Sequence, residues 1–255
     1  MQQDQIANIA PEGPMIEAVG LSKFYGDFAA VRNVSFSIDR GEVVAFLGPN
    51  GAGKSTTMKL LTGYLSPSEG RATIAGFDMC EDRINGSARL GYLPENGPLY
   101  PDMTPYGLLE FFAQARGMPA SQATQRIAEV VDLCSLREVL RKPIGKLSKG
   151  YRQRVGMAHS LLHEPEVLIL DEPTAGLDPN QIADVRDRLR HLGREKTILL
   201  STHILQEVEA VASRVLFIHQ GQLVFDGSLA ELRDKGSTLD AIFAELTAAS
   251  PSFSS

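Results

Sequence analysis

Two kinds of hydrophobic spacing alternate along this chain of 255 residues. Short apolar runs of strand length are followed by turns and then by segments whose apolar residues recur at helical spacing. Strands are predicted at 43–47, 167–171, 197–200, 215–219 and 223–226, and helices follow two of them at 179–192 and 204–211. Strands that are apolar throughout are typical of a parallel sheet covered on both faces. Repeated strand–helix units therefore predict an α/β fold with right-handed crossovers.

Two segments depart from this order. Residues 16–38 have apolar positions at intervals of two or three, which predicts a half-buried antiparallel hairpin or meander. Residues 100–165 have apolar positions at helical spacing and no strand run, which predicts an insertion of about three helices. Thr104 and Pro105 form a helix start, and Gly117 is placed to end that helix.

The ends of the chain are expected to lie outside the main domain, which we place at residues 15–235. Residues 1–14 are polar and lack the layout of a secretion signal, so we expect a flexible N-terminal tail. Short helices are predicted at 229–235 and 239–246. We assign residues 236–255 to a short C-terminal helix and tail.

Composition and charge exclude several classes of protein. The chain is 43% hydrophobic and 22% charged, which is ordinary for a globular protein. Its 25 basic and 31 acidic residues give a net charge of −6, which disfavours nucleic acid as a partner. Cys80 and Cys134 are far apart, and we expect packing residues in a reducing cytoplasm rather than a disulfide. No apolar run approaches the roughly 18 residues that span a bilayer, so any membrane role requires a partner.

A phosphate-binding motif lies between the strand at 43–47 and a predicted helix. Residues 48–56 fit G-x-x-x-x-G-K-[ST] in the strand-to-helix context that this motif requires. Backbone N–H groups of such a loop cradle a polyphosphate, Lys54 reaches the β and γ phosphates, and Ser55 is a ligand for Mg²⁺. A glycine-rich turn with a surface lysine is the alternative, which the full match disfavours. The residues assigned to the nucleotide here are Gly48, Pro49, Asn50, Gly51, Ala52, Gly53, Lys54, Ser55 and Thr56.

Two carboxylates and a histidine follow later strands. Asp171 and Glu172 end the strand at 167–171, and neighbours on a strand point to opposite sides. We therefore assign Asp171 to the Mg²⁺ site and Glu172 to polarising the attacking water. His203 follows the strand at 197–200 and is assigned to the γ-phosphate, although a histidine there is by itself more often structural. The remaining histidines are treated as structural: His159, His163, His191 and His219.

A further segment carries a family resemblance. Residues 147–154, LSKGYRQR, resemble the signature sequence of the ATP-binding-cassette (ABC) ATPases, usually LSGGQ. The phosphate loop, this segment, the run LILDEPTAGLDP and STH occur in family order, over about residues 16–225. The resemblance implies a P-loop NTPase fold: a RecA-like core, an N-terminal antiparallel β subdomain and a helical insertion carrying the signature. Glu95 stands where the family's Q-loop usually has Gln, and this variant resembles the subunits of gliding-motility and related export-type transporters.

The resemblance also implies a head-to-tail dimer with two ATP molecules at its interface. Ser148 and Gly150 would then contact the γ-phosphate held by the partner, and Asp178 would belong to the D-loop between the sites. Tyr25 corresponds to the aromatic residue that stacks on adenine, and an acid at position 95 can be a Mg²⁺ ligand. Lys149 and Tyr151 replace the usual Gly and Gln.

These residues favour a motor subunit that hydrolyses ATP and drives a separate membrane-spanning subunit from the cytoplasmic face of the cell membrane. The resemblance favours export over import. Contacts would lie at the cleft beside Glu95 and the helical insertion. The partner ATP-binding subunit is a second copy or a paralogue. A soluble ABC ATPase acting on ribosomes or DNA is the alternative, but that class usually has two cassettes or a long coiled-coil insertion and basic surfaces. A nucleotide-binding regulator without hydrolysis is disfavoured by Glu172 and His203.

Overall fold

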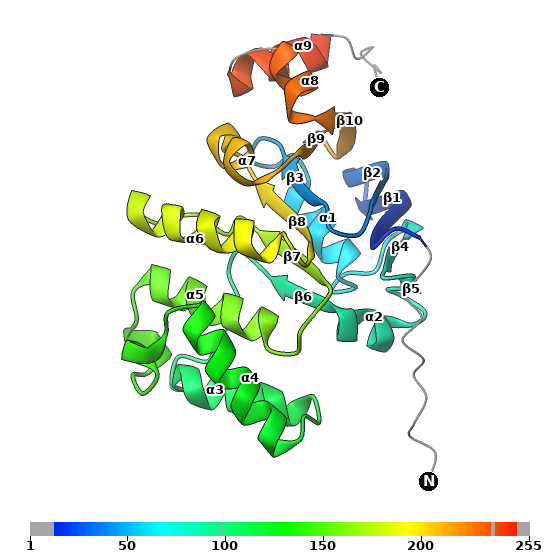
Figure 1. Cartoon of the computed structure of the whole chain (residues 1–255). Helices are drawn as coiled ribbons and strands as arrows, with labels where there is room; N and C mark the ends of the chain where they lie inside the picture. The colour runs from blue at the N-terminus through cyan, green and yellow to red at the C-terminus, as the bar shows by residue number, and fades with distance from the viewer. Residues whose placement is uncertain (1–12, 98, 236–237, 249–255) are drawn as a thin grey trace.

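The predicted strands belong to one six-stranded sheet in the computed structural model, which describes residues 13–97, 99–235 and 238–248 (Figure 1). The strand order is β10-β9-β3-β8-β7-β6, with β10 antiparallel to β9 and the other pairs parallel. The bounds are β3 Val43–Leu47, β6 Leu90–Leu93, β7 Val167–Asp171, β8 Thr197–Thr202, β9 Arg214–His219 and β10 Gln222–Ser228. The prediction of an α/β sheet is confirmed.

Side chains on the two faces of this sheet pack into different cores. Val44 and Phe46 of β3 face a core shared with helix α1 (Lys54–Leu61), whereas Ala45 and Leu47 pack with α7 (Leu205–Val211). Alternate residues of β7 and β8 face α5 (Lys149–Leu161) and α6 (Pro179–Leu192). Because both faces are covered, these strands are apolar throughout, as the sequence indicated.

A second, antiparallel sheet covers the far side of α1. Within the described residues its order is β2-β1-β4-β5, with β1 Ile16–Tyr25, β2 Phe28–Ile38, β4 Glu69–Ile74 and β5 Phe77–Asp78. The antiparallel pairing predicted for residues 16–38 is confirmed. Strands β4 and β5, helix α2 (Arg83–Arg89) and strand β6 were not predicted, since these segments are short and their apolar residues have no clear period.

Helices α3 (Pro105–Ala115), α4 (Ala120–Leu133) and α5 form a layer at the end of the molecule opposite α8 and α9 (Figure 1). Two short 3₁₀ turns, Arg137–Val139 and Ile144–Lys146, connect α4 to α5. The Thr104 hydroxyl accepts a hydrogen bond from the Gly107 amide at 3.1 Å, which confirms the predicted helix start. The helical character predicted for residues 100–165 is likewise confirmed.

The C-terminal helices α8 (Leu229–Asp234) and α9 (Leu239–Ala248) lie over β9 and β10. Leu232 and Ile242 pack with β3 and β9 in one core. Of the predicted tails, residues 1–12 and 249–255 lie outside the described residues. Within the ranges that the structure describes, no helix combines the length and apolar character needed to cross a membrane.

The two cysteines are free but differ in environment. Cys134 is buried, and burial raises the pKa of its thiol to about 12. Cys80 is exposed, so the expectation that it packs in the interior is wrong. It lies in the turn after β5, where its amide donates to Asp78 Oδ1 at 2.7 Å, and this turn holds it at the surface.

Candidate functional site

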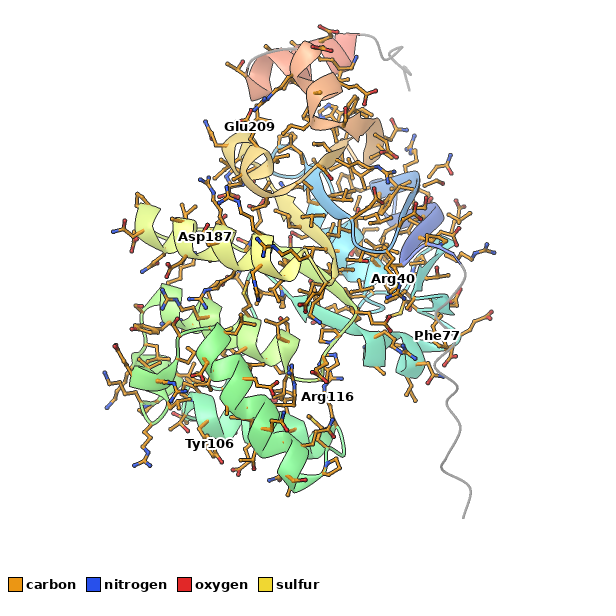
Figure 2. The ribbon with its side chains drawn as sticks, viewed as in Figure 1. Arg40, Phe77, Tyr106, Arg116, Asp187 and Glu209 are labelled. Carbon is orange, nitrogen blue, oxygen red and sulfur yellow. The ribbon has the colours of Figure 1, made fainter. Side chains whose placement is uncertain are left out.

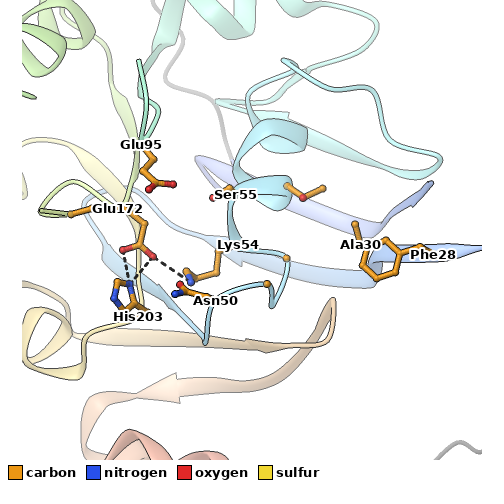
Figure 3. Close-up of a pocket in the computed structure, with 12 residues that line it drawn as sticks. Phe28, Ala30, Asn50, Lys54, Ser55, Glu95, Glu172 and His203 are labelled. Carbon is orange, nitrogen blue, oxygen red and sulfur yellow. Dashed lines mark hydrogen bonds and ion pairs between the residues drawn. The ribbon is translucent and has the colours of Figure 1, made fainter. Parts of the chain in front are cut away.

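The phosphate-binding motif forms the loop between β3 and α1, at the carboxyl edge of the parallel strands. Gly53 precedes α1 with φ +106°, and a Cβ at this position would lie 2.6 Å from the Ala30 carbonyl oxygen. Only glycine fits both the backbone conformation and the close approach. The amino end of α1 therefore faces a cavity of about 500 Å³ (Figure 3). Of the motif residues, those lining the cavity are Asn50, Gly51, Gly53, Lys54, Ser55 and Thr56.

Lys54 supplies the positive charge of this cavity. Its Nζ donates to the carbonyl oxygens of Gly48 at 2.8 Å and Pro49 at 3.2 Å, and lies 3.3 Å from Glu172 Oε1. These contacts hold the ammonium group over the loop, where the unpaired N–H groups of the helix amino end also lie. The combination attracts a polyphosphate.

Asp171 and Ser55 present oxygen atoms on the opposite side of the loop. Asp171 Oδ1 accepts hydrogen bonds from the hydroxyls of Ser55 at 3.2 Å and Ser201 at 2.5 Å. A carboxylate and a hydroxyl are suitable Mg²⁺ ligands, since Mg²⁺ at such sites takes its other ligands from phosphate and water. The described residues contain no group of three or more His, Cys, Asp or Glu side chains that could hold a metal by themselves. These two side chains fit a Mg²⁺ ion that is shared with a nucleotide.

Glu172 is buried and its carboxylate points into the cavity (Figure 3). Its oxygens lie 3.0 and 3.1 Å from Nδ1 of His203. The residue is not part of β7: its φ is +49°, and its amide donates to the backbone oxygen of Ser201 at 3.2 Å and to the Ser201 hydroxyl at 3.0 Å. The separate directions of Asp171 and Glu172 thus arise from a turn after β7, not from the alternation of a strand as the sequence suggested.

A buried residue that the sequence analysis missed holds the two loops together. Glu207, on α7, accepts hydrogen bonds from Thr174 at 2.5 Å and Thr202 at 2.6 Å. Thr174 follows Glu172, and Thr202 precedes His203. Glu207 therefore fixes the spacing between the candidate base and its histidine. The only signal in the sequence is an acidic residue on the apolar side of the predicted helix.

The cavity is lined by residues of β2 that the sequence analysis did not assign, and the assignment of Tyr25 to adenine stays a prediction. Phe28 and Ala30 of β2 line the cavity, whereas Tyr25 is not among its lining residues. Tyr25 is exposed and pairs with Phe28 across the hairpin, while Lys23 Nζ lies 5.6 Å from its ring centroid. Phe28 was missed because an exposed aromatic residue in a hairpin carries no motif.

Comparisons with known proteins agree with this geometry. A family model described as "ABC transporter" matches residues 31–175, more than half of the chain, and one described as "AAA domain, putative AbiEii toxin, Type IV TA system" matches residues 143–209. The "Uncharacterized ABC transporter ATP-binding protein YxlF" of Bacillus subtilis is 38% identical over 224 residues, which cover 88% of this chain and 74% of that protein. The chain belongs to the ABC transporter ATP-binding family. The "ABC transporter ATP-binding protein NatA" of Bacillus subtilis is also 38% identical, over 84% of this chain and 89% of that protein.

Solved structures of ABC cassettes share the fold. The "Structure of ATP binding subunit of ABC transporter" superposes with a TM-score of 0.82 and 33% identity, over 91% of this chain and 99% of that one. A "Dimeric structure of a post-hydrolysis state of the ATP-binding cassette MJ0796 bound to ADP and Pi" has a TM-score of 0.77 at 24% identity, over 84% of this chain and 99% of that one, and supports the fold alone.

In this ABC cassette, the signature residues lie outside the nucleotide cavity. Ser148 caps α5 by accepting from the Tyr151 amide at 3.4 Å, and Asp178 caps α6 by accepting from the Gln181 amide at 3.0 Å. A Cβ on Gly150 would lie 2.6 Å from the Gln181 side chain, so the two helix starts are in contact. Ser148 and Asp178 are exposed. Their roles toward a nucleotide stay predictions.

Proposed function

We propose that this chain is the ATP-hydrolysing subunit of an ABC transporter and that it drives a separate membrane-spanning subunit in the export direction. The observation that carries the hydrolytic part is that the buried Glu172 contacts both Lys54 and His203 at the cavity. Export is supported by a relative, the "Nod factor export ATP-binding protein I" of Ralstonia nicotianae, 36% identical over 86% of this chain and 68% of that protein.

The residues divide the work of hydrolysis by position. Lys54 and the amino end of α1 hold the β and γ phosphates, and Ser55 and Asp171 hold Mg²⁺, which neutralises phosphate charge when it is bound. Glu172 accepts a proton from the attacking water as the water oxygen bonds to the γ-phosphorus and the bond from that phosphorus to the bridging oxygen breaks, so that ADP leaves with that oxygen. His203 donates a hydrogen bond that orients Glu172. The second ATP-binding subunit adds Ser148 and Gly150 across the dimer interface, where the amino end of α5 is another group that attracts phosphate.

A second cavity supports a protein partner. A cleft of about 310 Å³ lies between the core and the helical layer, and the loop after β6 that carries Glu95 forms one of its walls. Two exposed aromatic residues, Tyr64 and Tyr100, line the cleft. Two more exposed apolar residues adjoin it: Ile84 follows the lining residue Arg83 in sequence, and the Phe111 ring contacts the Tyr100 ring. Clustered exposed apolar side chains mark an interaction surface more often than scattered ones do.

The charge of this cleft is positive. Arg83 and Arg116 line it, and Arg116 lies where the helical layer faces α2 (Figure 2). Burial lowers the pKa of His159 and His163 to about 4, so both histidines are neutral at pH 7. No acidic side chain is among the described residues that line the cleft. A cytoplasmic segment of the membrane subunit is the occupant that we propose, and the chain is then peripheral to the cytoplasmic face of the membrane.

Two experiments test these parts separately. Replacing Lys54 with Ala removes charge-assisted hydrogen bonds worth about 1.5–3 kcal/mol each, so ATP affinity measured by calorimetry should fall at least tenfold. An unchanged affinity would contradict the assignment of the phosphate site.

For the membrane partner, the tagged chain is purified from its native cells in mild detergent, and the Ile84→Glu variant is compared with the wild type. Ile84 is 85% exposed, so the variant should fold and bind ATP normally but lose at least nine-tenths of a co-purifying multi-span membrane protein. Val19→Glu, on the antiparallel sheet, is the matched control and should retain it. Wild-type protein that sediments with ribosomes and not with membranes would contradict the proposal.

A further inference from the structure

The contacts of Glu207 close a ring around the two side chains assigned to hydrolysis. Its Oε1 accepts a hydrogen bond from the Thr174 hydroxyl, and its Oε2 accepts one from the Thr202 hydroxyl. Thr174 lies two residues after Glu172, and Thr202 directly precedes His203. The ring is completed where His203 Nδ1 lies 3.0 and 3.1 Å from the Glu172 oxygens. A shift of either loop therefore changes the contact between these two side chains.

The position of His203 depends on Thr202. Strand β8 ends at Thr202, so no pairing with a neighbouring strand holds His203 itself. Its side chain is 41% exposed, and among the described residues its hydrogen-bonding partner is Glu172. The Thr202 hydroxyl also accepts from the Ile204 amide at 3.1 Å, so it fixes the backbone on both sides of the histidine.

The loop that carries Glu172 has two further attachments. The Glu172 amide donates to Ser201, and Gln153 Nε2 of α5 donates to the Pro173 carbonyl oxygen at 3.0 Å. These hydrogen bonds remain if the carboxylate of Glu207 is removed. Its loss therefore releases chiefly the loop after β8.

The burial of Glu207 is not explained by stability. The residue is 3% exposed, and the described part of the chain places no Lys, Arg or His nitrogen within 4.0 Å of its carboxylate. Burying an acidic side chain without a basic partner costs free energy, whereas an apolar side chain of similar volume would fill the position without that cost. What the acid adds is one acceptor oxygen for each loop.

We propose that Glu207 is a positioning residue for ATP hydrolysis: through Thr174 and Thr202 it keeps the His203 imidazole against the Glu172 carboxylate. Glu172 and His203 line the nucleotide cavity, whereas the other three residues of the ring do not, so Glu207 acts through that pair. This inference rests on the proposed function, because it concerns the hydrolytic step.

The test compares kcat for ATP hydrolysis with the affinity for AMP-PNP, a non-hydrolysable ATP analogue, in excess Mg²⁺. Glu207→Ala should lower kcat about 10- to 100-fold, the range for a displacement of about 1 Å at a catalytic group, and change AMP-PNP affinity less than about twofold. Glu207→Gln keeps the side-chain length and two hydrogen-bonding atoms, so kcat should recover to within about threefold of wild type. A fall in AMP-PNP affinity as large as the fall in kcat would overturn the proposal.

A matched pair at Thr174 keeps the proposal testable if Glu207→Ala does not fold. Thr174→Val has nearly the same shape but no hydroxyl, and should lower kcat at least about threefold, whereas Thr174→Ser keeps the hydroxyl and should match wild type. Glu209→Ala removes an exposed acid of α7 that pairs with Arg233, and this control should have wild-type kcat (Figure 2). Equal rates for the Val and Ser variants would overturn the proposal.

A second background separates positioning from a general effect on the fold. In His203→Ala the ring has no histidine to position, so adding Glu207→Ala should change the residual rate less than about twofold, measured in single turnover. The same fold-loss from Glu207→Ala in both backgrounds would mean that Glu207 does not act through His203, and would overturn the proposal.

A further measurement needs no hydrolysis. Amide hydrogen exchange at residues 203–205 should be about two- to tenfold faster in Glu207→Ala, because the loop after β8 loses its contact, and unchanged in Glu209→Ala. If the wild-type chain hydrolyses no ATP even with its membrane subunit, the proposed function fails, while exchange still reports the ring. Unchanged exchange in Glu207→Ala overturns the positioning role even if the wild-type chain hydrolyses ATP.

Discussion

Replacing one partner of the Lys54–Glu172 ion pair in the nucleotide-binding site should lower the free energy of unfolding by a measurable amount. The two side chains are only 6% and 8% exposed, and Nζ lies 3.3 Å from Oε1. At an effective dielectric of about 20, that distance corresponds to a Coulomb attraction of about 5 kcal/mol. Desolvation offsets much of this attraction, so the intact pair adds little net stability, but removal of one partner leaves a buried charge and costs about 3–5 kcal/mol.

Lys54→Met should therefore lower the free energy of unfolding by about 3 kcal/mol, at the low end of that range because Glu172 keeps its contact with His203. Adding Glu172→Gln removes the stranded carboxylate charge. The double variant Lys54→Met/Glu172→Gln should accordingly be more stable than Lys54→Met by about 1–2 kcal/mol, although Glu172→Gln alone is destabilising.

Urea unfolding in nucleotide-free and Mg²⁺-free buffer measures this cycle, followed by far-ultraviolet circular dichroism because the chain contains no tryptophan. Lys59→Met is the matched control: Lys59 is exposed on the same helix, and its replacement should change stability by less than about 0.5 kcal/mol. If the losses from the two single changes simply add in the double variant, the two charges do not interact and the reasoning is refuted.

Three further predictions concern activity, assembly and pH. Glu172→Gln should reduce ATP hydrolysis by a factor on the order of 10²–10⁴ while ATP still binds, and light scattering with Mg-ATP should then show dimers; monomer alone, once a need for the membrane partner is excluded, would count against two shared sites. Ser148→Arg should abolish that dimer without weakening ATP binding to the same subunit, and a matching loss of binding would place Ser148 in its own subunit's site. Because burial and then Arg116 lower the pKa of His159 from 6.5 to about 4, the unfolded chain binds the proton first, and stability is lost as pH falls from about 6.5 toward 4. His159→Phe, which keeps the ring contact with Phe112, should reduce that loss by up to about 3 kcal/mol, and an unchanged pH profile of urea unfolding would disprove the assignment.

The parts of this fold that the sequence predicted are those determined by nearby residues. The phosphate loop is one continuous segment, and its glycines, lysine and helix start form the same kind of loop between a strand and a helix in any α/β sheet. The helical layer and the apolar strands were predicted for the same reason, since spacing alone determines which face is buried. Strands β4 and β5 were missed because pairing, of β4 with β1 and of β5 with β4, and not their own composition, makes them strands.

The parts of the site that were missed depend on contacts between distant segments. Phe28 lines the cavity only because β2 passes close to Gly53, and Glu207 acts only because Thr174 and Thr202 meet on it. The residues in these contacts come from distant segments with no fixed spacing along the chain, so no sequence motif describes them.

The orientation of Glu172 shows how such long-range contacts decide the chemistry. Strands β7 and β8 pair in a register that sets Asp171 opposite Ser201. In that register the Ser201 hydroxyl donates to Asp171, and the hydroxyl and backbone oxygens of Ser201 accept from the Glu172 amide. These hydrogen bonds hold Glu172 in the left-handed conformation. A slip of one residue would place an apolar Leu200 or a Thr202 opposite Asp171 and reverse which side chains face each side of the sheet. The geometry of these candidate catalytic residues therefore depends on how β7 and β8 pair, and Asp171 and Glu172 take their two directions only once that pairing has formed.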